Sequence, residues 1–193
     1  MAVTITNDKN CFNNKHLSLL LKDNFDCQNC DIKQEGDFIL FFKNSQIVGM
    51  NIFNFKNYFE AESGFHLVST QIKKFLLEKF KQYLKLEDFE SFFKIGYVIE
   101  KTQHPSSEKL FILKVQFKNE CLQIITNVAS VEQDKHYLFA LNGATTYSGL
   151  SIKESKVMNV LSQGMIVSYE SLGMNQQGLV DCSNLTIEDE FIF

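Results

Sequence analysis

Residues 101–109 form a polar segment between two apolar stretches, and they carry the first group of side chains that could do chemistry. The segment contains His104, the only proline of the chain (Pro105) and Lys109, together with hydroxyl and carboxylate side chains. It is dense in hydrogen-bonding groups for its length, and Lys109 can contact a phosphate as a point charge. This composition predicts a loop that presents a binding group, although a plain surface loop is the more common explanation of such a segment.

A second group of such side chains lies in residues 160–168. Ser162 and Ser168 offer hydroxyl groups, Gly164 permits a close approach of the backbone, and Met165 offers a soft apolar contact. Loops with a cation, hydroxyls and an exposed apolar side chain suit the backbone of a nucleic acid and an unstacked base. An ordinary surface loop is again the alternative when this segment is taken alone.

The sequence contains no recognisable signature of catalysis. It has no nucleophile elbow, P-loop, dinucleotide fingerprint or HExxH motif, and no histidine lies in a context that identifies a general base. Cys27 and Cys30 have the spacing of a zinc-ligand pair, but no second pair supplies the other two ligands. We therefore expect no enzymatic activity and no cofactor, with a metal at the two cysteines as the weaker alternative.

The charge of the chain limits how it could bind nucleic acid. Its net charge is −4, and its 19 basic residues are all lysine. Residues 1–91 carry 11 lysines against 12 acidic residues, and residues 92–193 carry 8 against 11, so neither half is basic. Capture of nucleic acid by overall charge is therefore excluded, and a nucleic-acid partner has to be held by a local patch of lysines.

Neither a membrane span nor a targeting signal is visible in the sequence. No apolar run approaches the ~20 residues that a spanning helix needs, and residues 1–10 lack the charged and apolar regions of a signal peptide. The five cysteines are an odd number, which fits reduced thiols better than a disulfide framework. These features predict a cytoplasmic protein.

Residues 1–88 are expected to form a small α+β domain. Short apolar stretches predict strands at 3–6, 17–21, 38–42 and 47–55, with a hairpin turn at 43–46 and a polar loop at 24–35. Apolar residues spaced by three and four predict an amphipathic helix from Val68 to Leu84, with Ser69 as its N-cap. The outer side of this helix carries lysines that form either a solvated face or a face for phosphates: Lys73, Lys74, Lys79 and Lys81.

Residues 92–193 are expected to form an all-β domain, which follows an acidic connector at 86–91. Strands are predicted at 93–100, 111–117, 121–126, 136–141, 150–152 and 165–168, with a turn or a single helical turn at 171–174. Many short strands with little helix favour a closed or partly closed β-barrel. The apolar end of the chain, 191–193, predicts docking on a neighbouring unit or a partner chain.

The polar segments belong to a longer pattern that resembles a known module, the tRNA-binding domain. This domain is shared by endothelial monocyte-activating polypeptide II-like proteins, the N-terminal region of bacterial phenylalanyl-tRNA synthetase β-chains, and free-standing bacterial tRNA-binding proteins. The arrangement of both domains resembles the bacterial YtpR-type proteins. The matching residues keep their order over 93–174: His104-Pro105, Lys109-Leu110, Gln123-Ile124-Ile125, Asn127, Gly143-Ala144, Ser162, Gly164-Met165, Ser168, Glu170 and Leu172-Gly173.

The resemblance implies an OB-fold barrel that binds tRNA by shape and backbone, without catalysis. It implies tRNA as the partner, a possible association with an aminoacyl-tRNA synthetase or another translation factor, and either a monomer or a homodimer. The residues it places at the RNA surface are Lys109, Ser162 and Met165, with Asn127 and Ser168 as neighbours. His104 belongs to the same site and shapes the loop together with Pro105.

Three departures from the family pattern bear on affinity. Met158-Asn159 stand where the family usually has Arg-Gly, Ser106-Ser107-Glu108 replace Asp-Ala-Asp, and Val167 replaces a cysteine. The first departure removes a cation from the expected RNA surface. A protein-interaction module of the translation apparatus, built on an OB-fold with weak or no RNA binding, is therefore the alternative hypothesis.

Overall fold

The structure is a computed structural model that describes residues 3–6, 16–21, 29–61 and 64–191. The chain divides into two compact units, unit 1 up to residue 91 and unit 2 from residue 92. The described residues are mostly β, with a single α-helix. Cys27 of the possible zinc pair and residues 192–193 of the apolar C-terminus lie outside the described residues.

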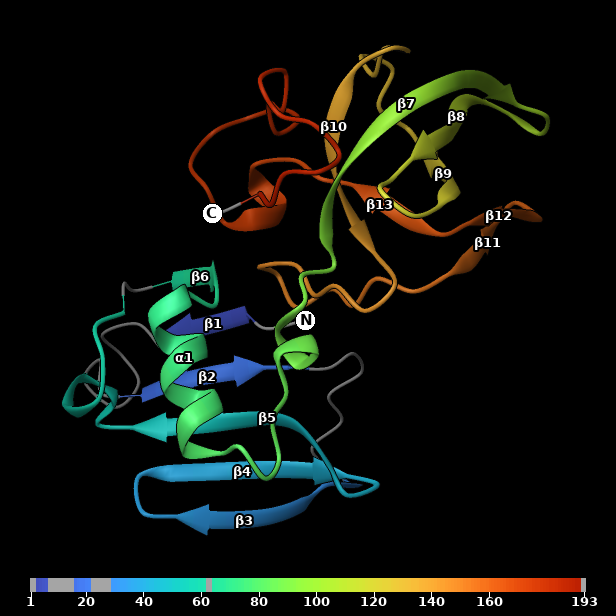
Figure 1. Cartoon of the computed structure of the whole chain (residues 1–193). Coiled ribbons are helices and arrows are strands. Elements are labelled where there is room, and N and C mark those ends of the chain that lie inside the picture. The colour runs from blue at the N-terminus through green and yellow to red at the C-terminus, as the bar shows by residue number, and fades with distance from the viewer. Residues whose placement is uncertain (1–2, 7–15, 22–28, 62–63, 192–193) are drawn as a thin grey trace. The chain divides into compact units, whose positions relative to one another are not determined.

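Unit 1 contains an antiparallel sheet whose described strands run in the order β3-β4-β5-β2-β1-β6 (Figure 1). The bounds of its elements are β1 Val3–Thr6, β2 His16–Leu20, β3 Asp31–Glu35, β4 Phe38–Lys43, β5 Gln46–Phe53, β6 Gly64–Leu67 and α1 Thr70–Lys79. The predicted β4–β5 hairpin is confirmed. Asn44 and Ser45 close it with φ angles of 50° and 64°, the left-handed conformation that a tight two-residue hairpin requires.

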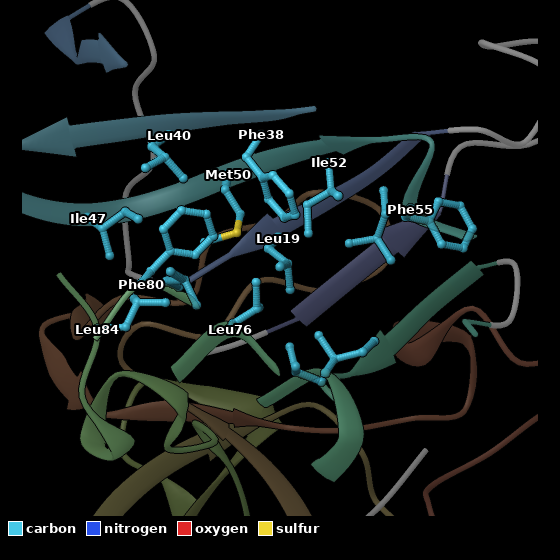
Figure 2. Packing of buried hydrophobic residues seen from close by; sticks show 14 of the residues in the cluster. Leu19, Phe38, Leu40, Ile47, Met50, Ile52, Phe55, Leu76, Phe80 and Leu84 are labelled. Carbon is cyan, nitrogen blue, oxygen red and sulfur yellow. The ribbon is translucent and has the colours of Figure 1, made fainter. Parts of the chain in front are cut away.

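The core of unit 1 lies between one face of this sheet and α1 (Figure 2). Alternate residues of β4 and β5, such as Leu40 and Met50, point into it, and Leu76 enters from the helix. The predicted N-cap is confirmed, because the Ile72 N–H donates to Ser69 Oγ at 3.3 Å. Apolar burial of this kind contributes about 25 cal/mol per Å² and holds helix and sheet together.

Two predictions for unit 1 are wrong in extent. The helix ends at Lys79, because Phe80 leaves the helical region with φ −116° and ψ 32°. Phe80 and Leu84 nevertheless stay in the core, which is why their spacing resembled a continued helix. Residues 31–35 form the edge strand β3 where a loop was predicted, and their exposed side chains leave no apolar alternation to reveal a strand.

Unit 2 contains a second antiparallel sheet, with the described strands in the order β13-β10-β7-β8-β9. A separate two-stranded hairpin is formed by β11 and β12. The bounds are β7 Phe93–His104, β8 Ser107–Gln116, β9 Cys121–Thr126, β10 His136–Leu141, β11 Ser155–Val157, β12 Val160–Ser162 and β13 Gly164–Ile166. Short 3-10 helices span Leu86–Phe89 in the connector and Glu170–Leu172 near the predicted helical turn.

The segment predicted as a polar loop, 101–109, is largely a β-hairpin. β7 continues to His104 and β8 begins at Ser107, so the turn consists of Pro105 and Ser106 alone. The hairpin extends beyond the core and most of its tip side chains are exposed, so polar residues suit it although it is a strand. Two other strand predictions also change: 150–152 contributes only the bridge from Ser151 to Thr145, and β11–β12 was not expected.

The core of unit 2 forms on the face of β7 that carries Gly96 and Val98. Val98 is fully buried there with Val115 and Phe139. A Cβ added to Gly96 would lie 2.5 Å from Val115 Cγ1, so only glycine fits at this position. Ile95 is also buried, so β7 is covered on both sides at this level and an alternating pattern cannot identify its inner face.

The edge strand β9 is hydrogen-bonded to the link between β12 and β13. The Gln163 N–H donates to the Gln123 carbonyl at 2.9 Å, and Gln123 Nε2 donates to the Leu161 carbonyl at 2.6 Å. Gly164 lies directly after this link, and a Cβ there would approach the Ala140 carbonyl oxygen to 2.8 Å. The close backbone approach predicted for Gly164 is therefore confirmed, and the two edges of the sheet are brought together at this point.

In the part of the chain that the structure describes, no helix has the length and apolar character needed to cross a membrane.

Candidate nucleic-acid interface

Lys109 lies in a bulge of β8 that a neighbouring glutamine holds in place. His104 pairs with Ser107 and Gln103 pairs with Phe111, which leaves residues 108–110 without partners on β7. The Gln103 amide Nε2 donates to the Ser107 carbonyl at 2.7 Å and to the Leu110 carbonyl at 2.8 Å, so it spans the bulge. Lys109 is exposed, and its ammonium is presented to solvent from a fixed backbone.

His104 is buried, with 2% of its surface exposed, and it joins this hairpin to β11. Its Nδ1 accepts a hydrogen bond from the Ser106 N–H at 3.1 Å, so in the neutral ring the proton lies on Nε2. Nε2 is 3.3 Å from the Val157 carbonyl oxygen and donates to it. The side chain of His104 therefore lies inside the hairpin and shapes it, the role that the resemblance gives it together with Pro105.

Ser162 is also buried, with 5% exposed, and its hydroxyl is used within the protein. Ser162 Oγ accepts from the Ile125 N–H at 3.0 Å and donates to the Gly164 carbonyl at 3.1 Å. These bonds tie β9 to the start of β13. The resemblance placed Ser162 at the RNA surface, whereas the structure buries it and uses its hydroxyl for two backbone groups.

The other three predicted site residues lie at different positions in unit 2. Asn127 is exposed directly after β9, and the pairing of Phe111 with Thr126 sets it at the same end of the β8–β9 pair as Lys109. Met165 is half-buried in β13, opposite Ala140. Ser168 lies beyond the other end of β13 from Ser162, so the structure does not bring it together with Lys109.

Ser168 has a local task at the 3-10 helix that follows it. Its Oγ accepts from the Ser171 N–H at 3.3 Å and lies 3.1 Å from Ser171 Oγ. A hydrogen bond from the Ser168 side chain also lowers the pKa of the Glu170 carboxyl, with further contributions from the backbone of Glu170 and Gly178. This hydroxyl therefore organises residues 168–171.

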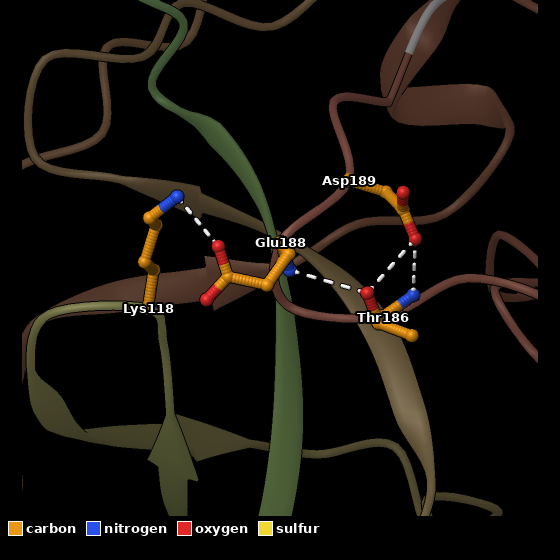
Figure 3. A network of polar contacts seen from close by, with 4 residues as sticks. All are labelled: Lys118, Thr186, Glu188 and Asp189. Carbon is orange, nitrogen blue, oxygen red and sulfur yellow. Dashed lines mark hydrogen bonds and ion pairs between the residues drawn. The ribbon is translucent and has the colours of Figure 1, made fainter.

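Three lysines of unit 2 already have partners inside the protein. Lys118 forms an ion pair with Glu188, in the C-terminal segment where Thr186 donates to Asp189 (Figure 3). Lys135 pairs with Glu132 at 2.8 Å. The Lys101 ammonium donates to the carbonyls of Ala129 at 2.7 Å and Val131 at 2.8 Å, and lies 4.1 Å from the centroid of the Phe111 ring. The ammonium groups of these three lysines are therefore engaged within the protein, and Lys101 fixes the 127–135 loop through its two hydrogen bonds to backbone carbonyls.

A second set of lysines is exposed, and within the described residues no ion pair or hydrogen bond engages their ammonium groups: Lys109, Lys114, Lys153 and Lys156. Lys114 lies on the outer surface of β8, opposite Glu100 of β7, in a depression of about 340 Å³ that is also lined by Glu100, Thr102, Ile112 and Gln123. Lys156 lies in β11, the strand that His104 joins to the Lys109 hairpin. These exposed lysines on β8 and β11 are the cations of unit 2 that are available for phosphate contact.

Gln103, Lys101 and Lys156 are the residues of this surface that the sequence did not reveal. Gln103 and Lys101 act through backbone carbonyls that lie 4 to 30 residues away along the chain. Every residue has a backbone carbonyl whatever its type, so no sequence motif could have indicated these hydrogen bonds. The only available signal for Lys156 was its place next to the departure at Met158-Asn159.

Comparison with known proteins gives consistent matches. A family model described as "Putative tRNA binding domain" matches residues 93–186. The putative tRNA-binding protein YtpR of Bacillus subtilis (strain 168) is 30% identical over 149 residues, 74% of each chain. The phenylalanine–tRNA ligase β subunit of Thermotoga maritima is 38% identical over 80 residues, which is 42% of this chain and 10% of that subunit. The corresponding subunit of Campylobacter jejuni (strain NCTC 11168) is 39% identical over 82 residues, 42% of this chain and 11% of that subunit.

A solved structure, the MetRS related protein from Pyrococcus horikoshii, matches 50% of this chain and 87% of its own at 27% identity, with a TM-score of 0.34. The sequence matches, and not this structural one, define the class as proteins with a tRNA-binding domain. The chain belongs to the YtpR-type family of this class, as the sequence pattern indicated. Its match to the ligase β subunits spans about a tenth of their length.

Proposed function

We propose that the chain is a non-catalytic tRNA-binding protein that recognises tRNA by shape and backbone through unit 2. The observation that carries this proposal is the Lys109 bulge: the resemblance leads us to expect a cation there, and Gln103 holds its backbone while the ammonium is exposed. A cation on a fixed backbone loses little conformational entropy when it meets a phosphate. The same reasoning places the protein in the cytoplasm, where tRNA is found.

We further infer that residues 92–193 form an OB-fold domain and residues 1–88 a small α+β domain. The five-stranded antiparallel sheet of unit 2, with β9 bonded to the β12–β13 link, supports a partly closed barrel of this kind. Burial of sheet and helix residues in one core supports the α+β assignment for unit 1. In an OB-fold the outer surface of the second and third strands is the surface that meets nucleic acid, which here is the surface of β8 and β9.

The residues of the proposed interface have different tasks. Lys109 and Asn127 are exposed at one end of β8 and β9 and contact the RNA backbone directly, and the half-buried Met165 of β13 offers an apolar contact. The buried side chains of Ser162 and His104 hold in place the strands that carry these contact residues. Ser168 organises a separate part of the surface.

Lysine has to supply every phosphate contact, because the chain contains no arginine. Each phosphate neutralised adds about 0.7 to 0.9 to the slope of log K against log salt. We therefore expect the affinity for tRNA to be low at high salt and to increase as salt is removed.

Filter binding of unfractionated tRNA to the full chain, over a series of salt concentrations, tests the proposal. Lys109→Ala is expected to weaken binding at low salt and to reduce the slope by about 0.7 to 0.9. Lys118→Ala is the matched control, because it removes the same charge from an exposed lysine that is paired with Glu188. Absence of micromolar binding by the wild type would overturn the function, and equal effects of the two variants would overturn the site.

A protein-interaction module of the translation apparatus is the second candidate. Its support is the net charge of −4 and a group of exposed apolar side chains in unit 2, with Tyr147 59%, Leu150 55% and Met174 43% exposed. A synthetase or another translation factor is the partner expected on this hypothesis. Pull-down from a nuclease-treated lysate separates the two candidates, because partners retained after RNA removal favour protein interaction and partners lost favour tRNA binding.

A further inference from the structure

The β11–β12 hairpin ends in a turn whose first residue is unusual for its conformation. Met158 and Asn159 have φ angles of 47° and 68°, so both lie in the left-handed region. Two such residues form the tight turn that suits a hairpin, and Asn or Gly are the residues that tolerate it. Asn159 fits this preference. Met158 does not, because a bulky side chain is disfavoured at positive φ.

Burial does not compensate for this conformation. Met158 is 52% exposed, and it is among the most exposed large apolar side chains of the described residues. An exposed apolar side chain in a disfavoured backbone conformation lowers the stability of the free protein. The hairpin turn needs this conformation but not a methionine, and strain of this kind, which a glycine would avoid, is a feature of functional sites.

The tip of this hairpin is joined to the Lys109 hairpin. His104 Nε2 donates to the carbonyl of Val157, the residue next to Met158, at 3.3 Å. Lys156 precedes Val157 and is exposed, and no described residue pairs with its ammonium. Lys109, Lys156 and Met158 therefore lie on two hairpins that one buried side chain links together.

The acidic groups near these cations do not neutralise them. Glu108 is exposed beside Lys109, and within the described residues it forms no ion pair with that lysine. Glu154 accepts a hydrogen bond from Gln163 Nε2 at 3.3 Å, two residues before Lys156. The linked tips therefore combine two available cations with one apolar side chain.

We propose that these two hairpin tips form an RNA clamp, in which Met158 packs against an unstacked base and Lys109 and Lys156 hold the neighbouring phosphates. The proposal rests on the proposed tRNA-binding function and adds a base contact to it. Thioether sulfur packs favourably on aromatic rings, and a base in a tRNA loop or at its end exposes such a ring. The clamp thus takes the place of the cation that the family pattern has at the hairpin tip.

Met158→Gly separates a ligand contact from a structural role. Glycine adopts φ 47° without strain, so the variant is expected to unfold at the same or a higher temperature than the wild type. Its affinity for unfractionated tRNA is expected to fall about two- to tenfold with an unchanged salt slope, because an apolar contact releases no counterions. Met174→Ala, at another exposed methionine of unit 2, is the control and should bind as the wild type does.

Lys156→Ala tests the phosphate part of the clamp. Its salt slope is expected to fall by about 0.7 to 0.9, as for Lys109→Ala, whereas Lys135→Ala, which removes a lysine paired with Glu132, should leave the slope unchanged. Wild-type tRNA binding at Met158→Gly, or an unchanged slope at Lys156→Ala, overturns the clamp. If the wild type binds and Lys109→Ala weakens it, the proposed function stands although the clamp fails. If the wild type does not bind tRNA, both fail.

Discussion

Ser162→Ala is expected to destabilise unit 2 without changing the charge of the RNA surface. The substitution removes a hydroxyl that accepts from the Ile125 N–H at 3.0 Å and donates to the Gly164 carbonyl at 3.1 Å. A buried polar group left without a partner costs about 1–3 kcal/mol. Ile125 is buried and Gly164 is only half-buried, so the two groups together should cost about 2–4 kcal/mol.

Hydrogen exchange read by mass spectrometry is the suitable assay, because it localises the effect to unit 2. A loss of 2–4 kcal/mol should accelerate exchange of β9 peptides by about 30- to 1,000-fold where exchange follows opening of the unit. Peptides from unit 1 provide the internal reference.

Ser155→Ala is the matched control for this substitution. Ser155 pairs with Ser162 across the β11–β12 hairpin but is exposed, and its change should stay within about 0.5 kcal/mol. The reasoning is refuted if Ser162→Ala exchanges like the control. It is also refuted if Ser162→Ala remains fully folded and weakens tRNA binding as strongly as the lysine variants do, since that result would place the hydroxyl on the RNA.

Three further predictions concern the supports of the same surface and its thiols. Gln103→Ala should release the backbone of the β8 bulge, so that Lys109→Ala lowers the affinity for tRNA less in that background than in the wild type. A double-mutant cycle on tRNA binding measures this coupling, and additive effects of the two substitutions would contradict it. Gly164→Ala should lower the melting temperature, because its Cβ would approach a backbone carbonyl to 2.8 Å and cost about 1–3 kcal/mol; an unchanged melting temperature would show that the link can shift freely. Burial, followed by the charge of the preceding aspartate, raises the pKa of Cys182 to about 11, whereas Cys121 is exposed. At pH 8 iodoacetamide should therefore modify Cys121 and spare Cys182, whose reactivity should rise only as the pH approaches 11; equal labelling at pH 8, read by mass spectrometry, would count against this.

Much of the fold could be predicted where burial imposes a period on the sequence. The β4–β5 hairpin, the helix start at Ser69 and the strands of unit 2 that line the core follow such periods. Edge and protruding elements could not be predicted in this way. β3 and the outer part of the β7–β8 hairpin expose most of their side chains. Backbone pairing and long-range side-chain hydrogen bonds, such as those of Gln103, fix them, and neither leaves an apolar period in the sequence.

The sequence by itself determined the family, through an ordered set of residues that runs from His104-Pro105 to Leu172-Gly173. It also determined that any phosphate contact has to come from lysine. Only the tertiary structure decided which polar residues of the set face outward. Ser162 satisfies a backbone N–H 37 residues away, and His104 satisfies a carbonyl 53 residues away, while Lys109 is left free. A hydroxyl or imidazole that serves a buried backbone group has the same donors and acceptors as one that serves a ligand, so long-range pairing, which sequence spacing does not contain, separates the two uses.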